Sequence, residues 1–128
     1  MDREILFRGK DIYGKWLYGD LINLTNELKQ ICNHTQLEHA HSVDIKTIGQ
    51  YTGLTDKNGK KIFEGDIVKD EQSGYEYVIK WFSEYACFAL ANKNGHMEYD
   101  VDEFEMLVND LIVVGNIHDS SDFAEVSE

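Results

Sequence analysis

The run from Tyr75 to Phe82 alternates more regularly than any other part of the chain, and it constrains the fold most strongly. In an extended chain every second side chain lies on one face, which here would carry Tyr75, Tyr77, Ile79 and Trp81. This period of two predicts a β-strand. Short apolar runs that could pair with it lie at residues 5–8, 16–22, 62–63, 67–68, 88–90 and 111–117. The last run is almost wholly apolar, which predicts a central strand.

Turn signals separate these runs at short intervals. Asn58-Gly59 is the strongest, because both residues accept the positive φ angle of a tight hairpin, and the residues from Asn92 to Gly95 close the run at 88–90. The chain has ten glycines and no proline, so its turns depend on Gly, Asn and Asp. Many short strands joined by such turns predict an all-β fold: a small closed or partly open barrel with short helical caps. A length of 128 residues predicts one domain, 1–128.

Two helical caps are expected near the C-terminal end of the sequence. Asp100 is the candidate N-cap of the first, in which Val101, Phe104 and the residues from Met106 to Val108 would point inward. Ser120 or Ser121 is the candidate N-cap of the second.

The segment from Asn23 to Val43 allows two interpretations. Its apolar residues have the spacing of one face of a short helix, at Leu24, Leu28, Ile31 and Cys32. The same residues could instead form a pair of strands with a turn at Asn26-Glu27. Strands are favoured, because residues 33–35 (Asn, His and Thr) are poor helix formers.

The charge balance argues against some classes of function. Twelve Lys and Arg residues stand against 24 Asp and Glu, a net charge of −12, and residues 98–128 contain no Lys or Arg. Because phosphate backbones attract cationic surfaces, nucleic acid is not an expected partner. No apolar run approaches the roughly 20 residues that span a membrane, and the N-terminus lacks the pattern of a signal peptide. With only two cysteines and no disulfide framework, we expect a cytoplasmic protein.

Residues 49–68, GQYTGLTDKNGKKIFEGDIV, closely resemble the signature of the YopX family of phage and prophage proteins. Residues 7–10, FRGK, with Trp16 resemble the family's N-terminus, and residues 114–119, VGNIHD, resemble its terminal strand and turn. The resemblance therefore spans nearly the whole chain. Where the family usually has proline, this chain has DIK at 44–46 and SSD at 120–122, and there Asp44 and Ser120 can cap a turn.

The resemblance implies a small, barrel-like, all-β protein with helical caps, encoded by a phage or prophage and acting in the cytoplasm of a bacterial host. It carries no catalytic residue and no ligand site over to this chain. Residues 65–68, GDIV, also resemble the strand entry of SH3-like barrels. The glycines of the signature fit tight turns at barrel corners, which favours a structural role for it.

One cluster has the residue types of a zinc site: Cys32, His34, His39 and His41. If the segment is extended, His39 and His41 share a face. The cluster lacks the Cys-x2-Cys pair of a zinc finger, and a polar loop with incidental histidines is the preferred explanation. No metal or other cofactor is predicted.

Two groups of residues are candidates for a binding surface. The first consists of lysines around the Asn-Gly turn that could contact phosphate: Lys57, Lys60 and Lys61. The second consists of aromatic residues on one strand face: Tyr75, Tyr77 and Trp81. Exposed lysines on a turn are commonly just solvated. Base-stacking platforms normally accompany a basic groove, so core packing or a protein-binding face is the preferred interpretation of the aromatic residues.

No catalytic arrangement is visible in the sequence. Cys87 lies among apolar residues and is expected to be buried, and the acidic pairs Asp100–Asp102 and Glu103–Glu105 are expected to form a solvated face. We therefore expect no enzyme but a protein-binding or assembly module, whose partner is an unidentified host or phage protein or a second copy of itself. The alternative is a modulator of nucleic-acid metabolism, acting through an acidic face that imitates DNA or through weak binding by the lysine hairpin.

Overall fold

The computed structural model describes residues 4–32 and 40–119. These residues form mainly β-strands in two antiparallel sheets with one short α-helix, which confirms the predicted β-rich fold. The chain divides into two compact units, Met1–Tyr51 and Thr52–Glu128, and strand β5 (Gly49–Thr55) passes from the first into the second. That residues 1–128 fold as one domain stays a prediction.

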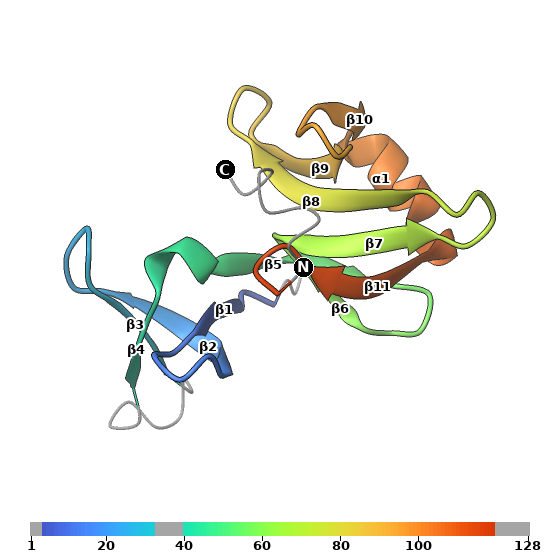
Figure 1. The fold of residues 1–128 in the computed structure, drawn as a ribbon. Helices are drawn as coiled ribbons and strands as arrows, with labels where there is room; N and C mark the ends of the chain where they lie inside the picture. The colour runs from blue at the N-terminus through green and yellow to red at the C-terminus, as the bar shows by residue number, and fades with distance from the viewer. Residues whose placement is uncertain (1–3, 33–39, 120–128) are drawn as a thin grey trace. The chain divides into compact units, whose positions relative to one another are not determined.

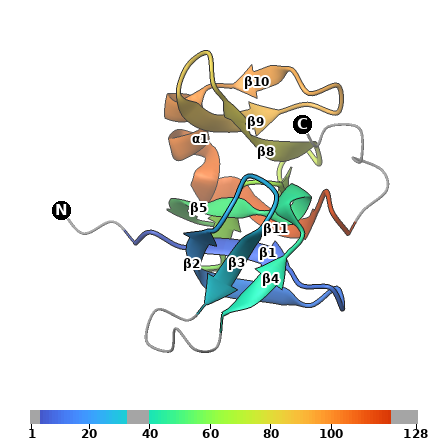
Figure 2. The same cartoon turned by 90° about the vertical axis from the view of Figure 1, so that its left-hand side faces the viewer.

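The first unit is an antiparallel sheet of short strands (Figure 1). The strands follow the order β4-β3-β2-β1-β5, with β1 at Phe7–Lys10, β2 at Trp16–Asn23, β3 at Lys29–Cys32 and β4 at His41–Val43, and β6 (Lys61–Phe63) of the second unit follows β5 as the sixth strand of this sheet. Figure 2 shows β2, β3 and β4 side by side. The preference for strands between residues 23 and 43 is thus confirmed for the residues that the structure describes.

Close packing explains part of the run FRGK in the first unit. A Cβ atom at Gly9 would lie 3.1 Å from the Cβ of Val43, a tight contact, so glycine suits the close approach of β1 to this buried residue. Arg8 is 5% exposed, and its guanidinium carbon lies 4.6 Å from the centre of the Trp16 ring, a cation–π contact. Gly9 and Arg8 therefore contribute to packing within the first unit.

The second unit contains a five-stranded antiparallel sheet with the order β10-β9-β8-β7-β11 (Figure 1). Its elements are β6 (Lys61–Phe63), β7 (Asp66–Asp70), β8 (Glu76–Phe82), β9 (Cys87–Ala91), β10 (Met97–Tyr99), α1 (Val101–Leu107), η3 (Val108–Asp110) and β11 (Leu111–Asn116). The main core consists of Ile62, Val68, Tyr77, Ile79, Leu90, Phe104 and Leu111. Val78 packs in a separate cluster with Ile67 and Ile117, so β8 is covered on both faces.

The position of β11 corrects one prediction: this apolar strand lies at the edge of the sheet, where it pairs with β7. On the edge of β11 that faces away from β7, residues of the turn after β5 form hydrogen bonds with the backbone of β11. The Asp56 carboxylate accepts the N–H of Val113 at 2.9 Å, and the Lys57 N–H donates to the carbonyl of Leu111 at 2.9 Å. An edge strand covered in this way can be as apolar as a central one.

The helical cap expected at Asp100 is present as α1. The Asp100 carboxylate accepts the N–H of Glu103 at 3.0 Å, and the Glu103 side chain accepts the N–H of Asp100 at 3.1 Å, which completes a capping box. Phe104 is buried as predicted. The prediction that Met106 points inward is wrong, because two residues advance a helix by about 200° and leave this side chain 79% exposed.

Asp44 caps a turn, as expected for the position where the family usually has proline. Asp44 begins the 3-10 turn η2 (Ile45–Thr47), and its carboxylate accepts the N–H of Lys46 at 3.0 Å. Ser120 and Ser121 lie outside the described residues.

The predicted barrel closure is not found within residues 4–32 and 40–119, because in neither sheet do the first and last strands pair with each other. The likeness to SH3-like barrels stays a prediction. Over the same residues, no helix is long and apolar enough to cross a membrane.

Candidate functional site

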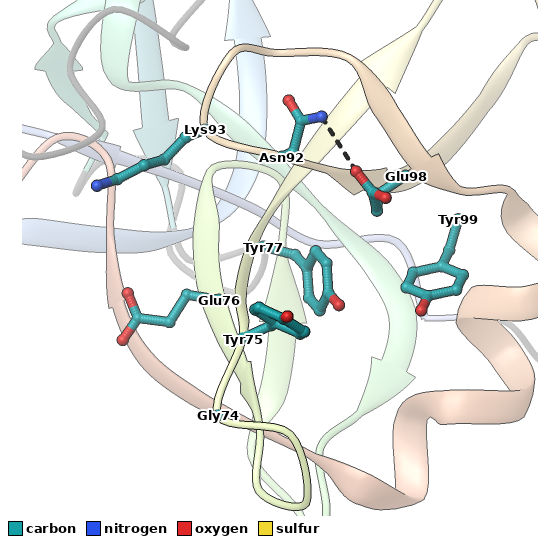
Figure 3. A pocket seen from close by; sticks show the side chains of 8 residues that line it. All are labelled: Gly74, Tyr75, Glu76, Tyr77, Asn92, Lys93, Glu98 and Tyr99. Carbon is teal, nitrogen blue, oxygen red and sulfur yellow. Dashed lines mark hydrogen bonds between the residues drawn. The ribbon is translucent and has the colours of Figure 1, made fainter.

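A cavity of about 570 Å³ in the second unit is the candidate site (Figure 3). A volume of this size is typical of sites that take a small molecule or a side chain. One wall comes from the β7–β8 turn and the start of β8, and the other from the β9–β10 turn and β10. The lining residues are Gly74, Tyr75, Glu76, Tyr77, Asn92, Lys93, Glu98 and Tyr99. We call the space that these eight residues line the tyrosine cavity.

The β7–β8 turn determines where Tyr75 lies. Gly74 has a φ of +82°, which favours glycine, and its N–H donates to the carbonyl of Asp70 at 2.7 Å. The N–H of Asp70 donates to the carbonyl of Tyr75 at 2.9 Å and closes the turn. Tyr75 is 68% exposed, so this residue is the most exposed of the three tyrosines that line the cavity.

Tyr77 forms the fixed part of the cavity, because its ring belongs to the main core and is only 6% exposed. Its centroid lies 5.5 Å from that of Tyr99, with the ring planes at 77°, an edge-to-face arrangement. Burial raises the pKa of Tyr77 to about 12, and hydrogen bonding to Tyr99 and the negative charges of Asp70 and Glu98 act in the same direction. The phenol therefore stays neutral at physiological pH and lies in a negative electrostatic field.

A β-bulge brings Tyr99 to this place. Met97 pairs with Ala91, whereas Tyr99 pairs with Leu90, so the register shifts by one residue between them. Neighbouring residues of a strand point to opposite faces, and a shift of one residue therefore changes the face that a side chain occupies. Leu90 belongs to the main core, and the bulge places Tyr99 on that same face, against Tyr77.

Asn92 links the β9–β10 turn to the cavity. Its Oδ1 accepts the N–H groups of Asn94 at 2.9 Å and His96 at 3.1 Å. Two backbone donors on the oxygen fix the orientation of the amide, so its Nδ2 points to Glu98 and donates to Oε1 at 3.0 Å. This exposed hydrogen bond orients the carboxylate of Glu98 on the cavity wall.

The cavity combines three electron-rich rings with more negative than positive side chains. Glu76 and Glu98 contribute carboxylates, and Lys93 contributes an ammonium group. Figure 3 shows Asn92 and Glu98 on one side of the tyrosine rings and Lys93 extending away from the rings. Ring faces, phenol hydroxyl groups and a carboxylate can together bind a ligand by stacking, hydrogen bonds and charge.

A family model described as YopX protein matches residues 6–125 of this sequence. The chain belongs to the YopX family. The match covers both compact units and all the lining residues of the tyrosine cavity, and it confirms the resemblance seen in residues 49–68. A search among curated proteins gives no match to this sequence.

Of the aromatic residues singled out from the sequence, the structure brings Tyr75 and Tyr77 together in the cavity of this YopX-family protein. Trp81 lies further along β8, 43% exposed, with its ring centroid 5.0 Å from that of Phe88. The three residues do not form one continuous exposed face, because Tyr77 between the other two is buried. Core packing is therefore the correct description of Tyr77.

The lysine group lies on the β5–β6 hairpin, apart from the lining of the tyrosine cavity. The hairpin turn is present as predicted, with the N–H of Gly59 donating to the carbonyl of Asp56 at 2.9 Å. Lys57 Nζ lies 2.6 Å from Glu71 Oε1, and this hydrogen-bonded ion pair raises the pKa of Lys57. The pair offsets part of the positive charge at the turn, and Lys60 and Lys61 are exposed.

The metal-site candidates are only partly described. His34 and His39 lie outside the described residues. Cys32 is buried and His41 is exposed, and because Ile31 pairs with His41 across β3 and β4, Cys32 points to the opposite face of the ladder from His41. Among residues 4–32 and 40–119, no group of three or more His, Cys, Asp or Glu side chains could hold a metal ion.

Sequence reasoning did not identify five lining residues that carry side chains: Glu76, Asn92, Lys93, Glu98 and Tyr99. The turn signal at residues 92–95 was readable, and it implies that the chain returns along β9. The turn signal does not predict how β10, a strand of three residues, pairs with β9. The bulge in β10 determines which face of the sheet Tyr99 occupies.

Proposed function

We propose that this YopX-family protein is a non-catalytic protein-binding or assembly module of phage or prophage origin, acting in the bacterial cytoplasm, and that the tyrosine cavity is its binding site. One observation carries the proposal: three tyrosines from two separate segments line a single cavity. Tyrosine is enriched among the residues that contribute most to protein–protein binding. The walls are also preorganised, because Tyr77 is part of the core and Asn92 holds Glu98.

The test is a capture experiment with a matched control. Untagged protein, its Tyr75→Ala variant and its Tyr85→Ala variant are each incubated with a bacterial lysate treated with nuclease, and retained proteins are identified by mass spectrometry. Tyr75 and Tyr85 are 68% and 67% exposed and lie at opposite ends of β8, so the two variants remove comparable exposed rings. We expect a partner that Tyr85→Ala retains and Tyr75→Ala loses. A partner lost equally from both variants contradicts the assignment of the cavity.

The module could also bind a second copy of itself. Light scattering of the purified protein distinguishes this case, since a self-associating chain has a mass above 14.8 kDa. Tyr75→Ala is expected to return such an assembly to the mass of one chain if the cavity forms the contact.

A second candidate is a modulator of nucleic-acid metabolism that imitates DNA. The described residues 98–119 carry seven carboxylates and no Lys or Arg, and Asp102 and Glu105 are exposed on α1. In this case the captured protein would be a nucleic-acid enzyme, its binding would survive Tyr75→Ala, and substitution of Asp102 and Glu105 by Ser would abolish it. Partners that disappear with nuclease would instead indicate direct binding of nucleic acid.

A further inference from the structure

The ring geometry of the tyrosine cavity is suited to a flat positive group. Tyr77 and Tyr99 pack edge to face, with their ring planes at 77°, and Tyr77 is only 6% exposed, so Tyr75, which is 68% exposed, provides the accessible ring. Aromatic faces carry negative charge density and attract cations placed over them. All three rings lie within one cavity of about 570 Å³, which is large enough for a long side chain with part of its backbone.

The charges around the rings favour a cation as well. The Glu98 carboxylate accepts a hydrogen bond from the Asn92 amide at 3.0 Å, whereas Glu76, although part of the lining, extends away from the rings in Figure 3. Burial is the main cause that raises the pKa of Tyr77, and the charges of Asp70 and Glu98 act in the same direction. Lys93 opposes this field, but its side chain extends away from the rings in Figure 3.

We propose that the tyrosine cavity takes an arginine side chain from a basic segment of the partner protein, with the guanidinium stacked on the exposed ring of Tyr75 and hydrogen-bonded to Glu98. This proposal rests on the assignment of the cavity as the binding site, and it specifies the chemistry of the partner. Arginine suits the cavity better than lysine, because its planar guanidinium stacks on rings and presents paired donors to a carboxylate. The net charge of −12 also attracts a basic segment during encounter.

The experiment uses a pair of probes that differ in charge and hardly in shape. The blocked tripeptide acetyl-Gly-Arg-Gly-amide is titrated into the 15N-labelled full chain, and the same peptide with citrulline in place of arginine is the control. Citrulline keeps the planar end group and loses its positive charge. We expect shifts in the amide signals of Tyr75, Tyr77, Glu98 and Tyr99, and an affinity at least about 10-fold higher for the arginine peptide.

Three variants locate the contact. Glu98→Gln keeps an acceptor for the Asn92 amide and removes the charge, so the affinity should fall about 3-fold. Tyr75→Ala should lower it about 10-fold through loss of an exposed ring. Tyr85→Ala removes an equally exposed ring outside the cavity and should leave the affinity unchanged. The free polyamine spermidine, titrated in parallel, should bind more weakly than the arginine peptide.

Three results would overturn the inference: no binding of the arginine peptide, equal binding of the arginine and citrulline peptides, or tighter binding of spermidine than of the arginine peptide. The outcome is separable from that of the capture experiment. If Tyr75→Ala loses a captured partner while the arginine peptide does not bind, the cavity remains the protein-binding site and the arginine inference is wrong. If the arginine peptide binds and Tyr75→Ala keeps every partner, the cation site stands and the proposed function is wrong.

Discussion

The turns at residues 56–60 and 92–96 have the same construction and serve different ends. In each, the side-chain oxygen of the first residue accepts the N–H groups of the third and fifth residues, at 2.8 and 2.9 Å for Asp56 and at 2.9 and 3.1 Å for Asn92. The fourth residue is a glycine with φ of +84° or +85°. A third copy begins at Asp11, whose Oδ1 accepts two N–H groups at 2.9 Å.

The difference lies in the second polar atom of the first side chain. Oδ2 of Asp56 accepts the N–H of Val113, 57 residues away, and so fixes the turn to β11. Nδ2 of Asn92 donates to Glu98 and so fixes a carboxylate of the tyrosine cavity. The turn geometry is thus a local property of the Asx-x-x-Gly pattern, whereas the choice of Asp or Asn decides whether the turn supports the fold or the site.

The largest expected effect is that of Asp56→Ala, which removes the acceptor of three backbone N–H groups from a residue that is 6% exposed. Hydrogen bonds to a charged acceptor are worth more than neutral ones, and we expect the free energy of unfolding to fall by about 3 kcal/mol. Urea unfolding followed by Trp81 fluorescence in a Trp16→Phe background measures this for the second unit.

Asp11→Ala is the matched control for that variant. It removes the same two hydrogen bonds of the turn from an exposed loop of the first unit, and the expected loss is about 1 kcal/mol, measured by Trp16 fluorescence in a Trp81→Phe background. Equal losses at Asp11 and Asp56 would show that the bond to Val113 contributes little to the fold.

The next expected effect is a loss of stability in acid that depends on Asp56. Burial raises the pKa of this carboxyl, but the N–H groups of Val113, Lys60 and Asn58 and the charge of Lys60 outweigh it, so the pKa in the folded state is below 3.8. The ionised group binds its proton more weakly in the folded state than in the unfolded state. Its contribution to stability is therefore complete above pH 3.8 and is lost as the pH falls through the lowered pKa.

Asp56→Asn isolates this contribution, because a protonated aspartate and an asparagine both present one acceptor and one donor. Unfolding of the two proteins is measured between pH 7 and pH 2. The difference in their free energies of unfolding should be constant near neutral pH. It should approach zero as the carboxylate of the native protein becomes protonated. A difference that persists unchanged at the lowest pH would exclude the ionised carboxylate as its source.

A smaller effect is expected from Gly59→Ala and Gly95→Ala, which test whether the two turns are locally equivalent. Both glycines have positive φ, and a Cβ atom would meet nothing within 4 Å at Gly59 and only the flexible end of Lys80, at 3.5 Å, at Gly95. Each variant should therefore lose about 1 kcal/mol through backbone strain alone. Urea unfolding of the two variants side by side checks this, and a clear inequality would mean that the turns differ in more than their second polar atom.

The sequence was sufficient to predict what depends on neighbouring residues. The alternation from Tyr75 to Phe82 predicts β8, the Asn-Gly pair predicts the hairpin at Gly59, and Asp100 predicts the start of α1. The location of β11 at the sheet edge was not predictable, because its outer edge is covered by Asp56, which is distant in sequence. Apolar composition alone cannot distinguish a central strand from a covered edge strand.

Only one of the two walls of the candidate site could be predicted from the sequence. Tyr75 and Tyr77 share a face by simple alternation, and they belong to one wall of the cavity. The opposite wall depends on a register shift in β10, a strand of three residues, and on the amide of Asn92 meeting Glu98. A pattern of period two contains no information about where a bulge interrupts it.

The smallest effect is expected for Asn92→Asp, and Asp56→Asn, which makes the reverse exchange in the other turn, provides the contrast. In Asp56→Asn the amide oxygen must serve the turn, as it does at Asn92, so the NH2 group faces the N–H of Val113 and leaves that donor unpaired, at a cost of about 2 kcal/mol. In Asn92→Asp the oxygen that holds the turn is kept, and the lost contact with Glu98 is exposed, so the change should stay within about 0.5 kcal/mol. Urea unfolding of both variants measures the contrast. If Asn92→Asp were as destabilising as Asp56→Asn, the second polar atom would not explain why one turn carries an acid and the other an amide.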